Sequence, residues 1–253
     1  MADDYDRVRP GPPEEALDWL VPRNCEIAVD LGAGTGLFTR ALQRRVRQVI
    51  AVEPDDRMRA VLAARSPGVR AVAGRGEAIP LPDASADGVF VSSAWHWLDP
   101  GQAVPEIARV LRDGGRLGVI WTSRDRRADW VAELDRLRRP QAVRSAEDAR
   151  VQLRRRHEVT LPGSAPFGNI ASASFAFART MAVDDAVGWL GTYSGVITAP
   201  DGERAAGLAR AREALLRRAS AAGEIEIPMQ SACWRADRTH RPAAGQPPSG
   251  RLR

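Results

Sequence analysis

Short apolar runs alternate with amphipathic segments over the first half of the chain. Five of these runs are short enough to be buried strands, at 26–31, 48–52, 69–73, 87–92 and 117–121. Between them, apolar residues recur at helical spacing, as Phe38, Ala41 and Leu42 do. Strands that alternate with helices in this way predict an α/β fold with a mostly parallel sheet covered by helices.

The amphipathic segments predict four helices in this half, at 14–20, near 38–42, near 58–62 and at 103–111. Pro12 and Pro13 precede the first helix, where a helix tolerates proline. The turn residues Asp113, Gly114 and Gly115 are expected to stop the fourth helix.

The pattern is weaker beyond Trp121. Residues 123–156 are rich in arginine and predict one exposed helix followed by a solvated stretch. Further strands are expected at 172–181 and 224–234, and further helices at 184–190 and 203–216. Pro228 interrupts the last strand, so we expect it at a bulge or at the edge of the sheet.

A glycine-rich segment from Val29 to Gly36 (VDLGAGTG) lies where the first strand would meet the next helix. Glycines there allow a ligand to approach the backbone, and the start of the helix offers free N–H groups. Glu53 ends the following strand, 17 residues after Gly36 (53 − 36). A carboxylate at that position can accept hydrogen bonds from both hydroxyls of an adenosine ribose. Together these residues predict a cofactor that contains adenosine.

The spacing of the glycines and one acidic residue narrow the choice of cofactor. The dinucleotide fingerprint requires a glycine where this chain has Leu37, so the pattern here is G-x-G-x-G. Asp30 precedes the first glycine by two residues and suits a ligand with an ammonium group better than a pyrophosphate. S-adenosylmethionine carries such an ammonium group as well as its sulfonium. Two alternatives remain open, namely NAD and a glycine turn that serves only to pack strand against helix.

Four segments carry a resemblance to a known family. They are VDLGAGTG, VIAVEPDDRM, GRGEAIPLPDASADGVFVSSAWHW and IARVLRDGGRLGVIW. They resemble the successive motifs of class I S-adenosylmethionine-dependent methyltransferases. More narrowly, the chain resembles the small-molecule enzymes related to trans-aconitate methyltransferase, through Tyr5, Arg9-Pro10-Gly11, Ser194, Glu203-Arg204 and Cys233-Trp234-Arg235. The resemblance runs from about residue 5 to 238 and is more specific for the cofactor than for the substrate.

The resemblance implies a Rossmann-like fold, with a seven-stranded, mostly parallel sheet and helices on both faces. It divides the chain into an N-terminal lid at 1–22 and a methyltransferase domain at 23–238. Within that domain, 123–220 would include a variable region that caps the acceptor pocket. Residues 239–253 are expected to be a disordered tail, because they are rich in proline, glycine and alanine without periodicity.

The resemblance also implies a set of residues around the cofactor. The expected cofactor-binding residues are Asp30, Gly32, Ala33, Gly34, Glu53, Pro54, Met58, Arg75, Gly76, Glu77 and Ser93. The methionine half would lie against the glycine segment, Glu53 would hold the ribose, and the loop at 74–78 would close over the adenine. Arg75 departs from the family pattern, because arginine offers no acceptor to the adenine amino group. Pro12 is a second departure, at a position where relatives usually carry tyrosine, and it could alter the lid.

The segment at 92–98 (SSAWHWL) would present the methyl acceptor, because open α/β sheets bind ligands beyond the carboxyl ends of their strands. If the acceptor is a hydroxyl group, His96 is the candidate catalytic base. Alternatively, His96 caps the next helix or bonds within the core. A carboxylate acceptor needs no base, only cationic partners such as Arg9, Arg124 or Arg126. The expected acceptor-contacting residues are Tyr5, Arg9, Trp95, Trp121, Arg124 and Tyr193, with core packing as the alternative for the tryptophans.

The chain has more basic than acidic side chains, which at first suggests a nucleic-acid partner. The chain has 37 basic and 32 acidic side chains, which gives a net charge of +5 (37 − 32) and a pI near 10.3. Four arginines follow Asp237 with no acid among them, so residues 1–237 carry 33 basic residues (37 − 4) against 32 acids. The body of the chain is therefore nearly neutral, and the excess does not argue for a nucleic-acid partner.

The remaining composition excludes several kinds of protein and site. No run of about 18 apolar residues is present to cross a membrane, and the acidic N-terminus does not resemble a secretory signal. Two cysteines and three scattered histidines predict neither a disulfide framework nor a metal site. We therefore expect a cytoplasmic protein, monomeric or weakly dimeric, that acts on a small molecule and binds no membrane.

The sequence thus predicts S-adenosylmethionine-dependent methyl transfer to an oxygen of a small molecule, with S-adenosylhomocysteine as product. The oxygen would belong to a carboxylate or a natural-product hydroxyl, with nitrogen and carbon as lesser alternatives. A protein of this fold that binds the cofactor without transferring methyl is the alternative from another class. An enzyme that modifies RNA or protein would need an asparagine- or aspartate-proline-proline segment after the fourth strand, which the chain lacks.

Overall fold

The computed structural model of the chain describes residues 9–137 and 158–239, which contain one seven-stranded sheet. The strands are β1 (Ile27–Leu31), β2 (Gln48–Val52), β3 (Arg70–Val72), β4 (Ala86–Ser92), β5 (Leu111–Arg124), β6 (Phe167–Ala182) and β7 (Glu224–Arg238). Their order across the sheet is β3-β2-β1-β4-β5-β7-β6. The first five strands are parallel, whereas β7 is antiparallel to both of its neighbours. The predicted Rossmann-like sheet is confirmed.

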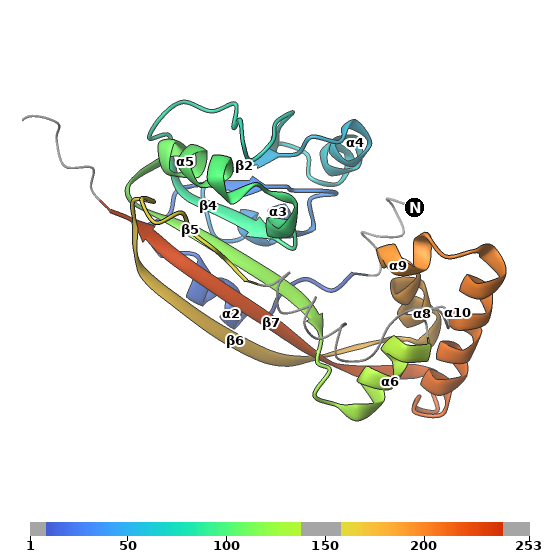
Figure 1. Cartoon of the computed structure of the whole chain (residues 1–253). Coiled ribbons are helices and arrows are strands. Elements are labelled where there is room, and N and C mark those ends of the chain that lie inside the picture. The colour runs from blue at the N-terminus through green and yellow to red at the C-terminus, as the bar shows by residue number, and fades with distance from the viewer. Residues whose placement is uncertain (1–8, 138–157, 240–253) are drawn as a thin grey trace, which may run out of the picture.

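Helices connect the strands (Figure 1). They are α2 (Glu14–Leu20), α3 (Leu37–Gln43), α4 (Asp56–Arg65), α5 (Pro100–Val110), α6 (Asp129–Leu137), α8 (Val183–Gly191), α9 (Ser194–Ile197) and α10 (Asp201–Leu216). Of these, α2 to α5 pack against the sheet. A single turn of 3-10 helix, η1 (Trp95–Trp97), follows β4. The helices predicted from periodicity in the first half of the chain are all present.

Side chains alternate across the sheet and so separate two apolar cores. In β4, Val89 and Val91 belong to the core that α5 covers, whereas Phe90 belongs to the core shared with α2 and α3. All three side chains are fully buried. Burial on both faces explains why the central strands are continuous apolar runs rather than alternating ones.

The prediction that Asp113, Gly114 and Gly115 stop the fourth helix is wrong. The preceding helix already ends at Val110, and these residues lie within β5. The ladder with β4 pairs Ala86 with Leu111 and then Gly88 with Arg116, so residues 112–115 bulge out of it. Gly114 has a φ of 75°, which a glycine adopts without steric cost. The glycines therefore form an irregularity inside a strand and do not end a helix.

The prediction for Pro228 is confirmed in part: the residue is not at a bulge, but it lies just past the end of the ladder with β5 and so has a paired strand on one side only. It pairs with Ala178 in regular register, in a strand that lies between β5 and β6. On the other side, the ladder with β5 ends at the pair of Arg124 and Met229. The carbonyl oxygen of Pro228 accepts the N–H of Asp125 at 2.8 Å, just beyond that end. The missing N–H of proline thus faces the end of a strand, where no ladder bond is lost.

A group of helices that we call the cap, α6, α8, α9 and α10, lies at one end of the β6–β7 pair (Figure 1). It has an apolar core of its own, formed with the adjoining ends of the two strands. Buried members of this core include Leu134, Trp189, Leu190, Leu215 and Met229. Among the described residues, none of its buried members belongs to either core of the sheet.

Several predictions fall partly outside the described residues. The structure describes the proposed lid from Arg9 onward, and the arginine-rich stretch only as far as residue 137. The predicted disordered tail lies outside the described residues except for Thr239. Among the helices that are described, none is long and apolar enough to cross a membrane.

Candidate functional site

The loop between β1 and α3 has backbone angles that favour glycine. The φ angle is 72° at Gly32 and 57° at Gly34. A Cβ atom on Gly32 would lie 2.7 Å from the Cβ of Ala94, whereas one on Gly34 would meet nothing within 4 Å. The N–H of Gly32 donates to the carbonyl oxygen of Val52 at 2.8 Å and fixes the loop to β2. The loop is therefore anchored at one glycine and open to a ligand at the next.

Asp30, at the carboxyl end of β1, is fully buried. Its Oδ2 accepts a hydrogen bond from Oγ1 of Thr39 at 2.6 Å, while its Oδ1 has no hydrogen-bond partner among the described residues. Burial raises the pKa of Asp30 to about 7, against the opposing effect of the Thr39 bond, and the charge of Glu53 raises it further. A buried polar atom left without a partner costs roughly 1–3 kcal/mol. A cationic ligand group would remove this cost.

Glu53 connects the end of β2 to the glycine loop. Its side chain is 8% exposed, with Oε2 accepting the N–H of Gly34 at 2.8 Å and Oε1 accepting the N–H of Asp55 at 3.0 Å. Each carboxylate oxygen can accept more than one hydrogen bond, so both retain capacity for ligand hydroxyls. The carboxylate is thus held in a fixed orientation beside the glycine that is open to a ligand.

A pocket of about 90 Å³ lies beyond the carboxyl ends of β1, β4 and β5, with room for several water-sized groups. Asp30 and the glycine loop line one side, and Ser92, Ser93 and Thr122 line the other. The N-terminal segment at 9–12 completes the lining. Ser93 has a φ of 56°, an uncommon value for a residue with a side chain, and such strain is concentrated at ligand sites. The pocket lies where open α/β sheets bind their ligands.

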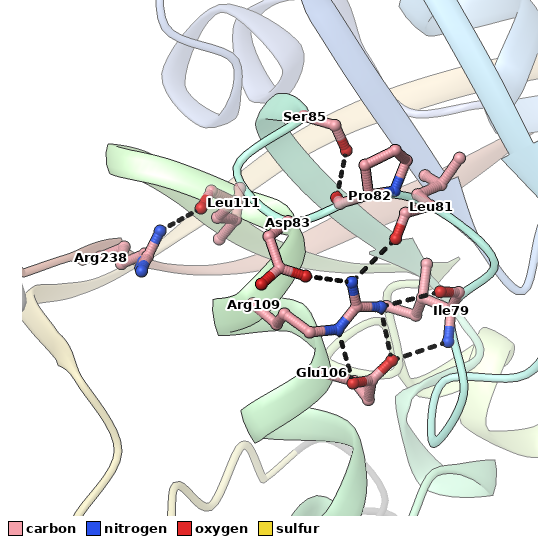
Figure 2. Close-up of polar contacts among 9 residues, drawn as sticks. All are labelled: Ile79, Leu81, Pro82, Asp83, Ser85, Glu106, Arg109, Leu111 and Arg238. Carbon is pink, nitrogen blue, oxygen red and sulfur yellow. Dashed lines mark hydrogen bonds and ion pairs between the residues drawn. The ribbon is translucent and has the colours of Figure 1, made fainter.

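Arg109 on α5 holds the segment that follows the predicted adenine loop (Figure 2). Its Nη1 donates to the carbonyl oxygen of Leu81 at 2.8 Å and to Oδ1 of Asp83 at 2.7 Å. Its Nη2 donates to the carbonyl oxygen of Ile79 at 2.9 Å, and Nε donates to Oε1 of Glu106 at 2.8 Å. Glu106 in turn accepts the N–H of Ile79 at 3.0 Å. The hydrogen bonds that Arg109 donates to Glu106 and then to Asp83 raise the pKa of Arg109 above its ordinary value, so the clamp is fully charged.

The predicted adenine loop is also tied to the loop that follows β4. Oε1 of Glu77 accepts the N–H of Asp99 at 3.0 Å. Asp99 caps α5, because its Oδ1 accepts the N–H of Gly101 at 2.9 Å. Glu77 therefore connects the segment expected at the adenine to the segment expected at the methyl acceptor.

Arg124, at the end of β5, is the buried centre of a cluster that includes Asp135, Trp189, Tyr193 and Arg9. Its side chain is 1% exposed, and its Nη2 donates to Oδ1 of Asp135. Its guanidinium carbon lies 4.8 Å from the ring centroids of both Trp189 and Tyr193. The guanidinium carbon of Arg9 lies 5.2 Å from the Tyr193 ring. We call these residues, with Arg126, the arginine cluster; Nε of Arg126 donates to Oδ2 of Asp135.

Comparisons with known proteins show which family the chain resembles. A family profile described as "Methyltransferase domain" matches residues 29–119. An uncharacterized methyltransferase of Mycobacterium tuberculosis is 38% identical over 234 residues, which cover 92% of this chain and 91% of that protein. The chain belongs to the class I S-adenosylmethionine-dependent methyltransferases. A methyltransferase-like protein of Schizosaccharomyces pombe is 31% identical over 206 residues, or 79% of this chain and 78% of that one.

A solved structure described as a type II methyltransferase from Anaeromyxobacter dehalogenans resembles this methyltransferase along most of its length. The two share 26% sequence identity with a TM-score of 0.66, and the match covers 92% of this chain and 99% of the other. The likeness therefore includes the cap as well as the sheet. In the described part of the methyltransferase, no group of three or more histidine, cysteine, aspartate or glutamate side chains is placed to hold a metal ion.

Only some of the predicted cofactor residues line the pocket. Asp30, Gly32, Ala33, Gly34 and Ser93 line the pocket, and Glu53 bonds to its glycine loop. The residues expected at the adenine are not among the pocket residues: Pro54 and Arg75 are exposed, Met58 and Glu77 are half-buried, and Gly76 is buried. All of these assignments stay predictions, and only those for the methionine half and the ribose concern residues that line the pocket or bond to its glycine loop.

The candidate base His96 lies on the surface in η1, with its ring centroid 4.7 Å from that of Trp97. It is not among the pocket residues, so its catalytic role stays a prediction. Trp95 and Trp121 are buried in the core under α5, which favours the packing alternative for both. Of the predicted acceptor residues, Arg9, Arg124 and Tyr193 come together in the arginine cluster, whereas Tyr5 lies outside the described residues.

Sequence reasoning missed several residues of the site. Thr39 bonds Asp30, Thr122 lines the pocket, and Asp135 and Trp189 contact Arg124. A signal existed for Thr122, because strand alternation places it on the face opposite Trp121 and on the same face as Arg124. The contacts of Asp135 and Trp189 join segments far apart in the chain, and no local pattern indicates them.

Proposed function

We propose that the methyltransferase transfers the methyl group of S-adenosylmethionine to an oxygen of a small-molecule acceptor in the pocket beyond β1, β4 and β5. The observation that carries this proposal is Asp30, whose buried Oδ1 has no partner among the described residues and which lines the pocket. A carboxylate oxygen in this state fits the ammonium group of the cofactor's methionine half. We assign the ribose hydroxyls to Glu53, whose Oε2 accepts the N–H of Gly34.

The residues of this chain fit the cofactor on chemical grounds. The ammonium of S-adenosylmethionine is a cation for Asp30, and its ribose supplies two donors for Glu53. The backbone of the glycine loop can approach a ligand closely because Gly34 has no Cβ in the open space beside it. When bound, the cofactor supplies an activated methyl group on a positively charged sulfur.

Methyl transfer leaves little covalent chemistry to the protein. A lone pair of the acceptor oxygen forms a bond to the methyl carbon, the carbon–sulfur bond breaks, and its electron pair stays on sulfur. The protein's part is to align the two reactants and to exclude water. We assign the alignment of the methyl donor to the glycine loop and to Asp30. We propose that the N-terminal segment at 9–12 is a lid that helps to exclude water. An anionic acceptor oxygen needs no base, which fits a pocket that His96 does not line.

The proposal also includes the acceptor atom and the functional organisation of the chain. The chain's resemblance to trans-aconitate methyltransferase rests on residues near both of its ends, and it favours oxygen over nitrogen or carbon as the acceptor atom. We propose the division into a lid at 1–22, a catalytic domain at 23–238 and a tail at 239–253 as the functional organisation. A protein that binds the cofactor without transferring methyl is the second candidate; it rests on the departures at Arg75 and Pro12, and the similarity to methyltransferases does not favour it.

Calorimetric titration with S-adenosylhomocysteine, S-adenosylmethionine and NAD tests the proposal. We expect the first two ligands to bind and NAD not to bind. Glu53→Ala should weaken S-adenosylhomocysteine binding by about tenfold or more, because it removes charge-assisted hydrogen bonds to the ribose. Glu26→Ala is the matched control, since Glu26 is exposed at the opposite end of β1.

Binding of NAD in preference to S-adenosylmethionine would overturn the proposal. Transfer of radioactive methyl from S-adenosylmethionine to a small molecule in a metabolite extract decides between the two candidate functions. Tight cofactor binding with no labelled product from any extract would favour the protein that does not transfer methyl.

A further inference from the structure

Arg124 has unused hydrogen-bonding capacity in a buried place. A guanidinium carries five N–H bonds, and the bond from Nη2 to Asp135 engages one of them. Nε and Nη1 are buried and have no acceptor among the described residues. Buried donors of this kind are rare in folded proteins and call for an explanation. A charged ligand group that the described residues do not supply is such an explanation.

The arginine cluster adjoins the cofactor pocket. Thr122 lines the pocket, and Arg124 projects from the same face of β5 because it lies two residues further along the strand. Two residues of a strand span about 7 Å. Arg9 belongs to both places, since it lines the pocket and its guanidinium carbon lies 5.2 Å from the ring of Tyr193. A ligand that extends from the pocket along β5 therefore reaches Arg124.

Charge and surroundings favour an anion at this place. The cluster contains three arginines, Arg9, Arg124 and Arg126, and one carboxylate, Asp135, which accepts hydrogen bonds from two of them. Trp189 and Tyr193 place aromatic rings beside the Arg124 guanidinium. Apolar surroundings of this kind strengthen the attraction between a buried cation and an anionic ligand group.

We propose that the methyl acceptor carries an anionic oxygen group, a carboxylate or a phosphate, which Arg124 binds through its N–H groups. This inference rests on the proposed function and adds the charge of the substrate to it. Arg124 is here a specificity-determining residue, because it contacts the substrate away from the atoms that react.

The bound anion is not the group that is methylated. An oxygen that accepts hydrogen bonds from a guanidinium has its lone pairs engaged and is a weaker nucleophile. Arg124 also lies about 7 Å along β5 from Thr122 at the pocket. The acceptor therefore has an anionic group at one end and a nucleophilic oxygen at the other.

A purely structural role for Arg124 predicts a different result. Through Asp135, Arg124 joins β5 to α6, and this connection uses Nη2 alone. A structural role alone would change stability in variants without changing which ligands bind. The decisive quantity is the preference of the protein for an anionic ligand over a neutral one of the same shape.

The experiment titrates the protein, saturated with S-adenosylhomocysteine, with three probes. They are 4-hydroxybenzoate, phenyl phosphate and 4-hydroxybenzamide, of which the first two are anionic and the third is the neutral counterpart of the first. We expect one anion to bind about tenfold or more tightly than the amide. The stronger of the two anions shows whether the group is a carboxylate or a phosphate.

Three variants locate the preference. Arg124→Gln should abolish it, and Arg124→Lys should retain only part of it because lysine lacks the planar array of donors. Arg127→Gln, which alters an exposed arginine paired with Asp125, should leave it unchanged. The double variant Arg124→Met with Asp135→Leu removes both buried charges and serves if a single variant fails to fold.

The outcomes separate this inference from the proposed function. Three outcomes would overturn the inference and leave the proposed function intact. They are equal affinity for the anions and the amide, no measurable binding of either anion, and an unchanged preference in Arg124→Gln. Failure of S-adenosylhomocysteine to bind the unaltered protein would overturn the proposed function itself. Loss of the preference in Arg124→Gln with unchanged S-adenosylhomocysteine affinity supports both.

Discussion

The carboxyl group of Asp30 combines a structural cost with a proposed role in binding. Burial disfavours its charged form and holds its pKa at about 7, compared with an ordinary value of 3.8. The folded protein therefore binds this proton more tightly than the unfolded chain does. Through this group, the free energy of unfolding falls as the pH rises from about 4 to about 7. A bound ammonium group would reverse the effect, because it stabilises the carboxylate.

The affinity for S-adenosylhomocysteine should therefore depend on pH. It should rise by roughly tenfold between about pH 6 and 7.5, as Asp30 becomes ionised, and fall again at more alkaline pH as the ligand's own ammonium loses its proton. Calorimetric titrations in buffers with different ionisation enthalpies would also detect proton release on binding below pH 7.

Asp30→Asn is the control for this pH dependence. The variant should bind more weakly at pH 7.5 and lose the rise in affinity between pH 6 and 7.5, since its amide does not titrate. An unaltered protein whose affinity is constant over that interval would show that the ligand's ammonium does not contact Asp30.

At the scale of single elements, the loop between β3 and β4 depends on Arg109 for its shape. The clamp shown in Figure 2 joins this loop to α5 through carbonyl oxygens and two carboxylates. The clamp also holds Glu106, which accepts the N–H of Ile79. Arg109 is therefore a positioning residue for the segment expected to close over the adenine.

Arg109→Met should reduce both stability and cofactor affinity. Loss of several charge-assisted hydrogen bonds should lower the free energy of unfolding by roughly 2–4 kcal/mol, which denaturant titration measures. The same variant should weaken S-adenosylhomocysteine binding several-fold, because the adenine loop loses its support.

Arg47→Met provides the comparison, since Arg47 is exposed and its ion pair with Glu26 at 3.5 Å contributes little. It should change stability by less than about 0.5 kcal/mol and leave affinity unchanged. If Arg109→Met unfolds more easily but binds the ligand normally, the clamp stabilises the fold without shaping the site.

The sequence was sufficient for the elements whose signals are local. The glycine spacing located Asp30 and the loop, and the apolar runs located β1 to β4 to within a few residues. The length of β5 and the place of β7 between β5 and β6 depend on antiparallel pairing, which joins β5 to a segment more than 100 residues away, as in the pair of Val119 and Trp234. The partners of Arg124 were missed for the same reason, because aromatic contacts from α8 leave no trace in the sequence around β5.

At the scale of the whole molecule, two bodies share the strands β5, β6 and β7. One body is the sheet with α2 to α5, and the other is the cap with its separate core (Figure 1). The arginine cluster lies where they meet, because Arg124 belongs to β5 whereas Trp189 and Tyr193 come from the cap. Acceptor binding between these bodies would therefore depend on both.

Hydrogen exchange measured by mass spectrometry should distinguish the two bodies. Peptides from α8 and α10 should exchange at least about tenfold faster than those from β1 and β4, because the cap has the smaller core and can open on its own. S-adenosylhomocysteine should slow exchange in the glycine loop and have a weaker effect on α10. Equal protection of α8 and β4 would instead indicate one cooperative unit.

A cap with its own core also affects how such an enzyme diverges. Substitutions around Trp189 and Leu215 alter the packing of the cap without contacting the strands that hold the glycine loop. New acceptor preferences can thus arise by mutation in one body while the donor's pocket is inherited unchanged. For protein engineering, residues 183–223 would have to be exchanged together with α6, because Leu134 of α6 belongs to the same core as Trp189 and Leu215.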